Sequence, residues 1–223
     1  MTACQRMYVA GGHKRGVTDQ TDEAPVTADL PEAPFHTTGT DHITLVGSNE
    51  DDTVAFYRDL LGMPLVLRQP NLDDPTSTHL FFDTGDGRIL TFFVSDDRQS
   101  GGAPLRHQVG SVHHIAFSID PHRFADVKEA LDAAGHGFNE FDRGVFHSLY
   151  TRDHNGLTIE LATDKYDVPE DRRGEVLAAT QRHRVEDGAE YAEARHLEAA
   201  LEELGLGADP VELPDAPTGA GVD

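Results

Sequence analysis

The sequence predicts an α+β fold in which two βαβββ repeats form a curved half-barrel with a metal-binding pocket, followed by a C-terminal helical extension. One order of elements, a strand, a helix and three strands, occurs twice along the chain. Each repeat opens with a histidine, His42 and His114, directly before an apolar strand, and Glu160 lies in the apolar strand that closes the second repeat. Because a histidine recurs in register, chance is a poor explanation for the repeat.

The first repeat is expected to span residues 40–95. A strand is predicted over residues 41–46, with Ser48 as the N-cap of a helix that stops at Gly62. Three strand-like runs follow, and the turn at residues 85–87 joins the last two as a hairpin. These runs are residues 64–69, 77–83 and 89–94.

The second repeat is expected to span residues 111–164 and to follow the same order. A strand over residues 111–119 leads to a helix that is capped by Asp120, carries Pro121 in its first turn and stops at Gly135. The three strands that follow are predicted at residues 137–141, 145–152 and 157–163. Together the two repeats define a domain over residues 38–167.

The segments outside this domain are expected to be less regular. Residues 1–37 carry no apolar periodicity and are predicted to be disordered. Residues 168–223 are predicted to form a helical extension with a loose tail, with one or two helices between residues 169 and 206 that pack rather than catalyse. The expected buried positions of these helices are Ala192, Leu197, Ala200, Leu201 and Leu204.

The composition limits the partners and the compartment. With 40 acidic and 18 basic residues, the chain has a formal charge of −22, which disfavours nucleic acid and anionic membranes as partners. No membrane span or signal-peptide core is expected, and the single cysteine, Cys4, fits a reducing cytoplasm. The acidic residues are spread along the chain, which favours a surface adapted to high salt over a site for a cationic partner.

Equivalent positions of the two repeats define a candidate metal site. Two curved half-sheets that face each other enclose a pocket, and inward positions on the first and last strands of each repeat would meet there. These positions are His42 and Thr91 in the first repeat, and His114 and Glu160 in the second. Two histidines and one carboxylate leave coordination positions open, as in non-haem Fe(II) oxygenases. Four protein ligands would instead suit a redox-inert Lewis acid, so Thr91 favours iron.

The alternative is that these histidines are ordinary surface or packed residues, since the chain has 13 of them. Their register with each other and with Glu160 favours a role as ligands. His79 and His147 are further candidates near the expected pocket, and the spacing selects neither of them.

Two segments of the chain carry a resemblance to a known family. The first comprises residues 71–75, 79–82 and 89–93. The second is residues 143–164, in which an arginine, a tyrosine and a glutamate precede the closing Leu-Ala-Thr-Asp. With them, residues 38–167 resemble the vicinal oxygen chelate superfamily of glyoxalases, bleomycin resistance proteins and extradiol dioxygenases. The chain is most similar to the ring-cleaving dioxygenases that open hydroquinones.

The resemblance implies specific residue roles. His42, His114 and Glu160 would bind Fe(II), with Mn or another divalent metal as the alternative. The residues implied to contact substrate oxygens or to transfer protons are Tyr150, Arg143 and His113. The chain departs from this pattern in having two units where such enzymes have four, and in carrying Asp41 before the first ligand. Whether the repeats pair within one chain or across a dimer is open.

The expected function is therefore an Fe(II)-dependent extradiol-type dioxygenase that cleaves a catechol- or hydroquinone-like diphenol with dioxygen. A homodimer is the expected assembly. Two alternatives remain: a glyoxalase-like metal-dependent isomerase, lyase or thiol transferase, and a resistance protein of the same fold that sequesters its ligand.

Overall fold

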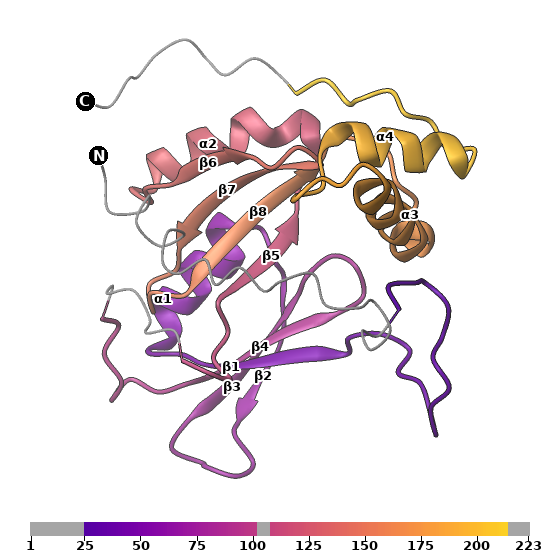
Figure 1. Cartoon of the computed structure of the whole chain (residues 1–223). Coiled ribbons are helices and arrows are strands. Elements are labelled where there is room, and N and C mark those ends of the chain that lie inside the picture. The colour runs from indigo at the N-terminus through magenta and orange to yellow at the C-terminus, as the bar shows by residue number, and fades with distance from the viewer. Residues whose placement is uncertain (1–24, 102–107, 214–223) are drawn as a thin grey trace.

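The computed structural model describes residues 25–101 and 108–213 (Figure 1). Residues 25–41 are exposed and carry neither helix nor strand. The disorder predicted for residues 1–24 and the loose tail predicted from residue 214 onward lie outside the described residues. None of the helices in the described ranges combines the length and apolar character that a membrane span needs.

The first repeat forms a four-stranded sheet in the order β1-β4-β3-β2. In this sheet β1 is parallel to β4, and the other neighbours are antiparallel. Between β1 and β2 the chain forms α1 (Glu50–Val54), which continues as a π-helical turn, η2 (Ala55–Leu60). The strands are β1 (His42–Val46), β2 (Leu65–Pro70), β3 (Thr78–Asp83) and β4 (Ile89–Val94).

The predicted cap of this helix is wrong by one residue. Asn49, not Ser48, is the N-cap, because its side chain accepts a hydrogen bond from the backbone N–H of Asp52. The predicted helix stop is confirmed at Gly62, which has a φ of +75°.

The second repeat forms a separate four-stranded sheet with the same topology, β5-β8-β7-β6. After β5, Asp120 caps a 3₁₀ turn, η3 (Pro121–Arg123), which leads into α2 (Phe124–Ala133). The predicted cap at Asp120 is therefore confirmed. The strands are β5 (His114–Ser118), β6 (Asn139–Asp142), β7 (Phe146–Arg152) and β8 (Thr158–Asp164).

The strand registers confirm that the two repeats are equivalent. In the first sheet Thr91 on β4 lies opposite Thr44 on β1, and in the second Glu160 on β8 lies opposite Ala116 on β5. His42 and His114 occupy the first position of β1 and β5. The predicted α+β fold of two βαβββ repeats is thus observed, and within residues 25–101 and 108–213 the strands form two mixed sheets and no closed barrel.

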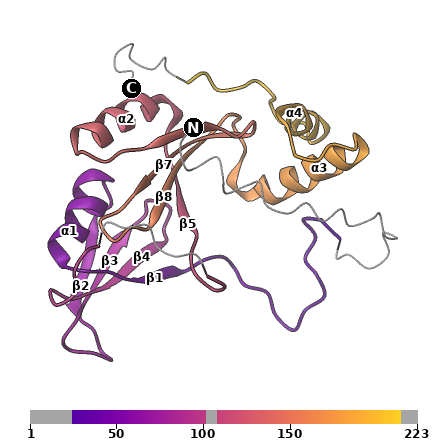
Figure 2. The same cartoon turned by 60° about the vertical axis from the view of Figure 1, so that its left-hand side comes forward.

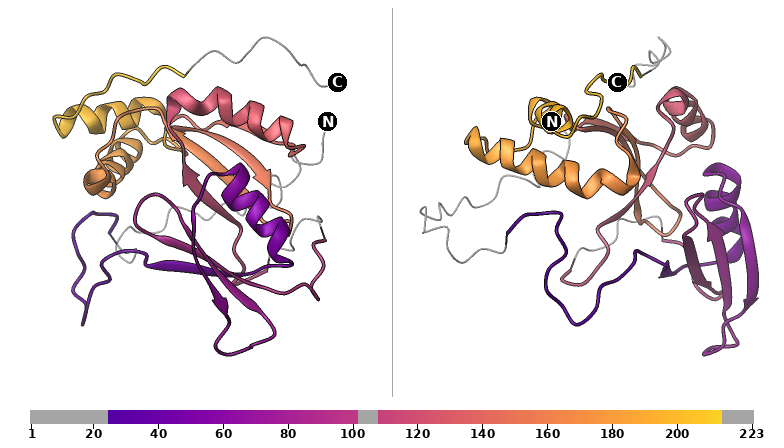
Figure 3. Two further views of the ribbon diagram at one scale, coloured as in Figure 1. Left: turned by 180° about the vertical axis from the view of Figure 1, so that it is seen from behind. Right: turned by 90° about the vertical axis from the view of Figure 1, so that its right-hand side faces the viewer.

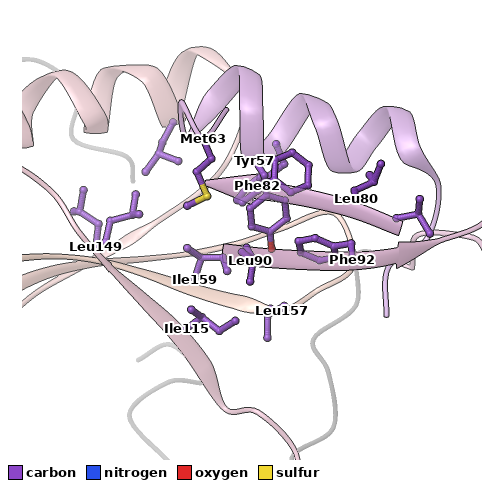
Figure 4. Packing of buried hydrophobic residues seen from close by; sticks show 14 of the residues in the cluster. Tyr57, Met63, Leu80, Phe82, Leu90, Phe92, Ile115, Leu149, Leu157 and Ile159 are labelled. Atoms are coloured by element: carbon purple, nitrogen blue, oxygen red, sulfur yellow. The ribbon is translucent and has the colours of Figure 1, made fainter. Parts of the chain in front are cut away.

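Both sheets contribute to one hydrophobic core (Figure 4). The core residues alternate with the candidate site residues: Leu90 and Phe92 flank Thr91, and Ile159 and Leu161 flank Glu160. Because successive residues of a strand point to opposite faces, Thr91 and Glu160 lie on sheet faces that point away from this core. We call these the site faces of the first and second sheet.

Buried polar contacts join the helix of the first repeat to the β7–β8 hairpin of the second. The hydroxyl of Tyr57 donates to Oδ2 of Asp153 at 2.9 Å. Oγ1 of Thr53 lies 3.1 Å from Nε2 of His154, and the backbone N–H of Ser48 donates to Oδ1 of Asn155 at 3.0 Å. Burial, and then the negative charge of Asp153, raise the pKa of Tyr57 well above its ordinary value. Tyr57 therefore stays protonated and donates.

The Tyr57→Phe variant is expected to unfold more easily because it removes a buried hydrogen bond to a carboxylate. We expect a loss of about 2 kcal/mol in the free energy of unfolding, measured by urea denaturation. The slope of the unfolding free energy against urea concentration should stay unchanged, since unfolding exposes the same surface in both proteins. A loss below about 0.5 kcal/mol would show that Tyr57 contributes through its ring alone.

The predicted helical extension consists of two helices, α3 (Arg173–Glu186) and α4 (Ala194–Glu203), after a short turn, η4 (Glu170–Arg172). They pack on Tyr166 and lie apart from α1 and α2, at the end of the second sheet where β5 and β8 finish (Figures 1, 2 and 3). Leu197, Ala200 and Leu201 are buried as predicted. Ala192 is not, because it precedes α4 and is exposed.

Candidate metal and substrate site

Glu160 is the centre of a polar cluster on the site face of the second sheet. Its side chain is only 5% exposed, although it is a carboxylate in the middle of a strand. Oε2 of Glu160 lies 3.0 Å from Nε2 of His114, and Oε1 accepts a hydrogen bond from Oγ of Ser148 at 2.7 Å. These partners, on the two strands that flank β8, compensate the burial of the charge.

His113 extends the cluster from the other side of His114. Nδ1 of His113 lies 2.7 Å from Nδ1 of His114, and a hydrogen bond between them requires one of the two atoms to lack a proton. When Nε2 of His114 donates to Glu160, Nδ1 of the neutral ring accepts from His113. The contact therefore orients the imidazole of His114 toward the carboxylate.

Tyr150 and Arg143 complete the cluster. Tyr150 lies opposite Glu160 on β7, and its ring centroid is 5.8 Å from that of His114. The guanidinium carbon of Arg143 lies 5.6 Å from the ring centroid of Tyr150 and 4.5 Å from that of Phe141. Burial raises the pKa of Tyr150, as do hydrogen bonding to Glu160 and its charge, while Arg143 opposes this rise.

His42 lies outside this cluster. Its side chain is 55% exposed, and Nδ1 lies 2.6 Å from Oδ1 of Asp41. Among residues 25–101 and 108–213, no three or more His, Cys, Asp or Glu side chains form a group that could hold a metal ion. The single chain therefore brings together five of the six predicted site residues, and it does not bring His42 to His114 and Glu160.

Thr91, the counterpart of Glu160, is fully buried, and its hydroxyl donates to Oγ1 of Thr44 at 2.8 Å. The hydroxyl thus already has a partner within its own sheet. Thr91 is therefore a neutral residue at the position where the second repeat has the carboxylate of Glu160.

The residues present fit a divalent metal ion with part of its coordination shell. Nε2 of His114 and Oε2 of Glu160 lie 3.0 Å apart, near enough for one ion to contact both, and imidazole and carboxylate are ligands that suit Fe, Mn and Zn. The contact of His42 with Asp41 resembles the carboxylate–histidine pairs that orient metal-binding imidazoles. The third predicted ligand, His42, lies outside the cluster.

Two side chains of β7, Ser148 and His147, differ from the sequence-based expectation for the site. Ser148 was not among the predicted site residues, although alternation along β7 places it on the same face as Tyr150. The same alternation places His147 on the opposite face, where Nε2 pairs with Glu140 at 2.9 Å. His147 is therefore not part of the cluster.

Comparison with known proteins relates this geometry to a family. Residues 39–161 match the model of the Glyoxalase/Bleomycin resistance protein/Dioxygenase superfamily. "Putative ring-cleaving dioxygenase MhqE" of Bacillus subtilis (strain 168) is 32% identical over 107 residues, which are 47% of this chain and 34% of that protein. "Putative ring-cleaving dioxygenase MhqA" of the same organism is 28% identical over 138 residues, 60% of this chain and 42% of that protein.

Solved structures agree on the fold. A protein titled "putative dioxygenase" from Bacillus subtilis subsp. subtilis str. 168 superimposes with a TM-score of 0.51 at 25% identity, covering 58% of this chain and 42% of that one. A glyoxylase/bleomycin resistance protein/dioxygenase domain from Frankia sp. EAN1pec gives 0.50 at 19% identity, covering 58% and 100%. The chain spans less than half the length of the curated relatives named above. It belongs to the Glyoxalase/Bleomycin resistance protein/Dioxygenase superfamily.

Proposed function

We propose that this chain is an Fe(II)-dependent extradiol-type dioxygenase that cleaves the ring of a diphenol, and that two copies of the chain complete each site. The observation that carries the proposal is the cluster of His113, His114, Arg143, Tyr150 and Glu160 on the site face of the second sheet. The names of the curated relatives support ring cleavage as the reaction class.

Each residue of the cluster has a chemical task in this proposal. His114 and Glu160 would hold the iron, which when bound would supply open positions for a substrate oxygen and for dioxygen. Arg143 stabilises negative charge on a substrate oxygen, since its guanidinium lies beside the phenol of Tyr150. Tyr150, which lies opposite Glu160 on β7, exchanges a proton with that oxygen. When Nε2 of His114 binds the metal, its Nδ1 carries the proton and donates to Nδ1 of His113, so His113 still orients the ring.

The third protein ligand in this proposal is His42 of a second copy. His42 is exposed at the start of β1, on the site face of the first sheet, and that face lies away from the core of its own chain. A two-fold axis that brings the first sheet of one copy to the second sheet of the other forms two equal sites. Each site then contains His42 from one copy, and His114 and Glu160 from the other.

Metal content and oxygen uptake test the proposal. Protein purified without oxygen is expected to hold about one iron per chain, measured by metal analysis, and to consume dioxygen when catechol or hydroquinone is added. The His114→Ala variant should lose both properties, because it removes a ligand. The matched control is His122→Ala, an exposed histidine whose backbone N–H, not its ring, bonds to Asp120.

Retention of iron and turnover by His114→Ala would contradict the proposed site. Turnover that needs no dioxygen and runs with a redox-inert metal would instead assign the chain to the isomerases and lyases of the superfamily.

A further inference from the structure

The site face of the first sheet carries a second histidine, His79, in a setting unlike that of His42. His79 on β3 lies opposite Phe93 on β4, and Phe93 lies opposite Val46 on β1. Phe93 and Thr91 are two residues apart on β4, so their side chains point to the same face of the sheet. His79, opposite Phe93, points to that face as well. It therefore points away from the core, toward the surface that the proposed dimer would cover.

The imidazole of His79 packs against two phenylalanine rings. Its centroid lies 4.0 Å from that of Phe81, at an interplanar angle of 38°, and 4.4 Å from that of Phe93, at 46°. Nε2 of His79 is buried and has no hydrogen-bond partner among the described residues. The packing fixes the ring but leaves this nitrogen unpaired.

Other buried, unpaired side-chain atoms in the described ranges lie elsewhere. Oγ of Ser48 and Nδ1 of His154 belong to the contact between the repeats, and Oγ1 of Thr163 lies on the core face of β8. Of the four, His79 alone is on a site face. An unpaired buried polar atom destabilises a fold, and such atoms call for an explanation that is often functional. A phenylalanine would fill the same aromatic stack without this cost.

The charge state of His79 suits it to bind a neutral hydroxyl group. Burial lowers the pKa of His79, and the charge of His42 lowers it further, so the neutral form of the ring is favoured. A neutral imidazole offers one N–H and one lone pair. The β3 strand is also two strands away from β1, about 10 Å at ordinary strand spacing. A group bound to His79 is therefore well separated from a metal held by His42.

We propose that His79 is a substrate-binding residue whose Nε2 hydrogen bonds with the diphenol hydroxyl that lies farther from the metal. The ring of the diphenol then packs against Phe81 and Phe93. This inference rests on the proposed function, and it deepens it by selecting diphenols whose two hydroxyls lie at opposite ends of the ring. Catechol, whose hydroxyls are adjacent, has no group to reach His79 when both are on the metal.

Binding of two ligands to two proteins tests this assignment. Calorimetric titrations without oxygen would compare hydroquinone with 4-methylphenol, which lacks the second hydroxyl, on iron-loaded wild type and His79→Phe. The wild type is expected to bind hydroquinone with a Kd about tenfold lower than that of 4-methylphenol, because one hydrogen bond to a buried group changes Kd by about this factor. His79→Phe should bind the two ligands equally and keep its iron. His147→Phe, a change on the opposite face of the second sheet, should keep the preference.

Two further variants locate the effect at Nε2. The His79→Gln side chain places a polar atom near the position of Nε2 and should restore part of the preference, whereas His79→Asn, which reaches only the position of Nδ1, should not. His79→Phe should also melt at an equal or higher temperature than the wild type, since it removes an unpaired buried nitrogen.

The possible outcomes separate this inference from the proposed function. If the iron-loaded wild type binds neither ligand, the proposed function fails and the inference fails with it. If the wild type prefers hydroquinone and His79→Phe keeps that preference, the role of His79 is overturned while the proposed function stands.

Discussion

An equal mixture of the His42→Ala and His114→Ala variants is expected to regain about a quarter of the wild-type oxygen uptake, although each variant alone is inactive. In a dimer whose sites each take His42 from one copy and His114 from the other, a mixed dimer contains one site with both histidines and one with neither. Random exchange of subunits makes about half of all dimers mixed, so about one site in four is intact. Purification of mixed dimers through two different affinity tags should raise the value to about one half.

The structure supplies the reason for this expectation. In one chain His114 and Glu160 are in contact, but His42 does not join them, because both sheets turn their apolar faces to a common core. In the proposed dimer, the second copy supplies the His42 that the cluster of one chain lacks. Recovery of activity by mixing is therefore the result that the proposed dimer predicts.

The control is a mixture of His114→Ala and Glu160→Gln, which change the same half of the site. Every site in their mixed dimers lacks one ligand, so no activity should return. If verified mixed dimers of His42→Ala and His114→Ala are also inactive, the two repeats do not share sites between chains, and His42 is not a ligand.

Much of the site could be predicted because it depends on relations within one sheet. Strand alternation and hairpin register determine which residues of β5, β7 and β8 are neighbours, so Glu160 and His114 lie together as the repeat predicts. Tyr150, which only the resemblance implied, lies opposite Glu160 by the same register. The equivalence of Thr91 and Glu160 follows from the same rule.

The relation between the two sheets could not be predicted, because it depends on which face of each sheet is buried. In the first sheet both faces carry aromatic residues: Phe82 and Phe92 point to the core, while Phe81 and Phe93 lie on the site face. The alternation of apolar residues therefore does not predict which face of the first sheet is buried in the core. The position of His42 relative to the cluster is decided by tertiary packing.

The Glu160→Gln variant is expected to lose the stabilisation by metal that the wild type shows. A ligand that binds only the folded state stabilises the wild type by about 2.7 kcal/mol at a concentration 100 times its Kd. For a chain of this size that is a rise of roughly 5 to 10 °C in Tm. Mn(II) serves as a metal that is stable in air, and thermal denaturation at constant protein concentration measures the shift.

Glutamine matches the shape of Glu160 and can still accept the hydrogen bond from Ser148, so the fold should persist. It lacks the charge and the second carboxylate oxygen, and it is a weak ligand for a divalent ion beside His114. The matched control is Glu140→Gln on β6, whose carboxylate pairs with Lys128 and His147 on the opposite face. Its metal-dependent shift should equal that of the wild type. An equal shift in Glu160→Gln would place the metal elsewhere, because the only acidic side chain of the cluster would then not contribute to binding.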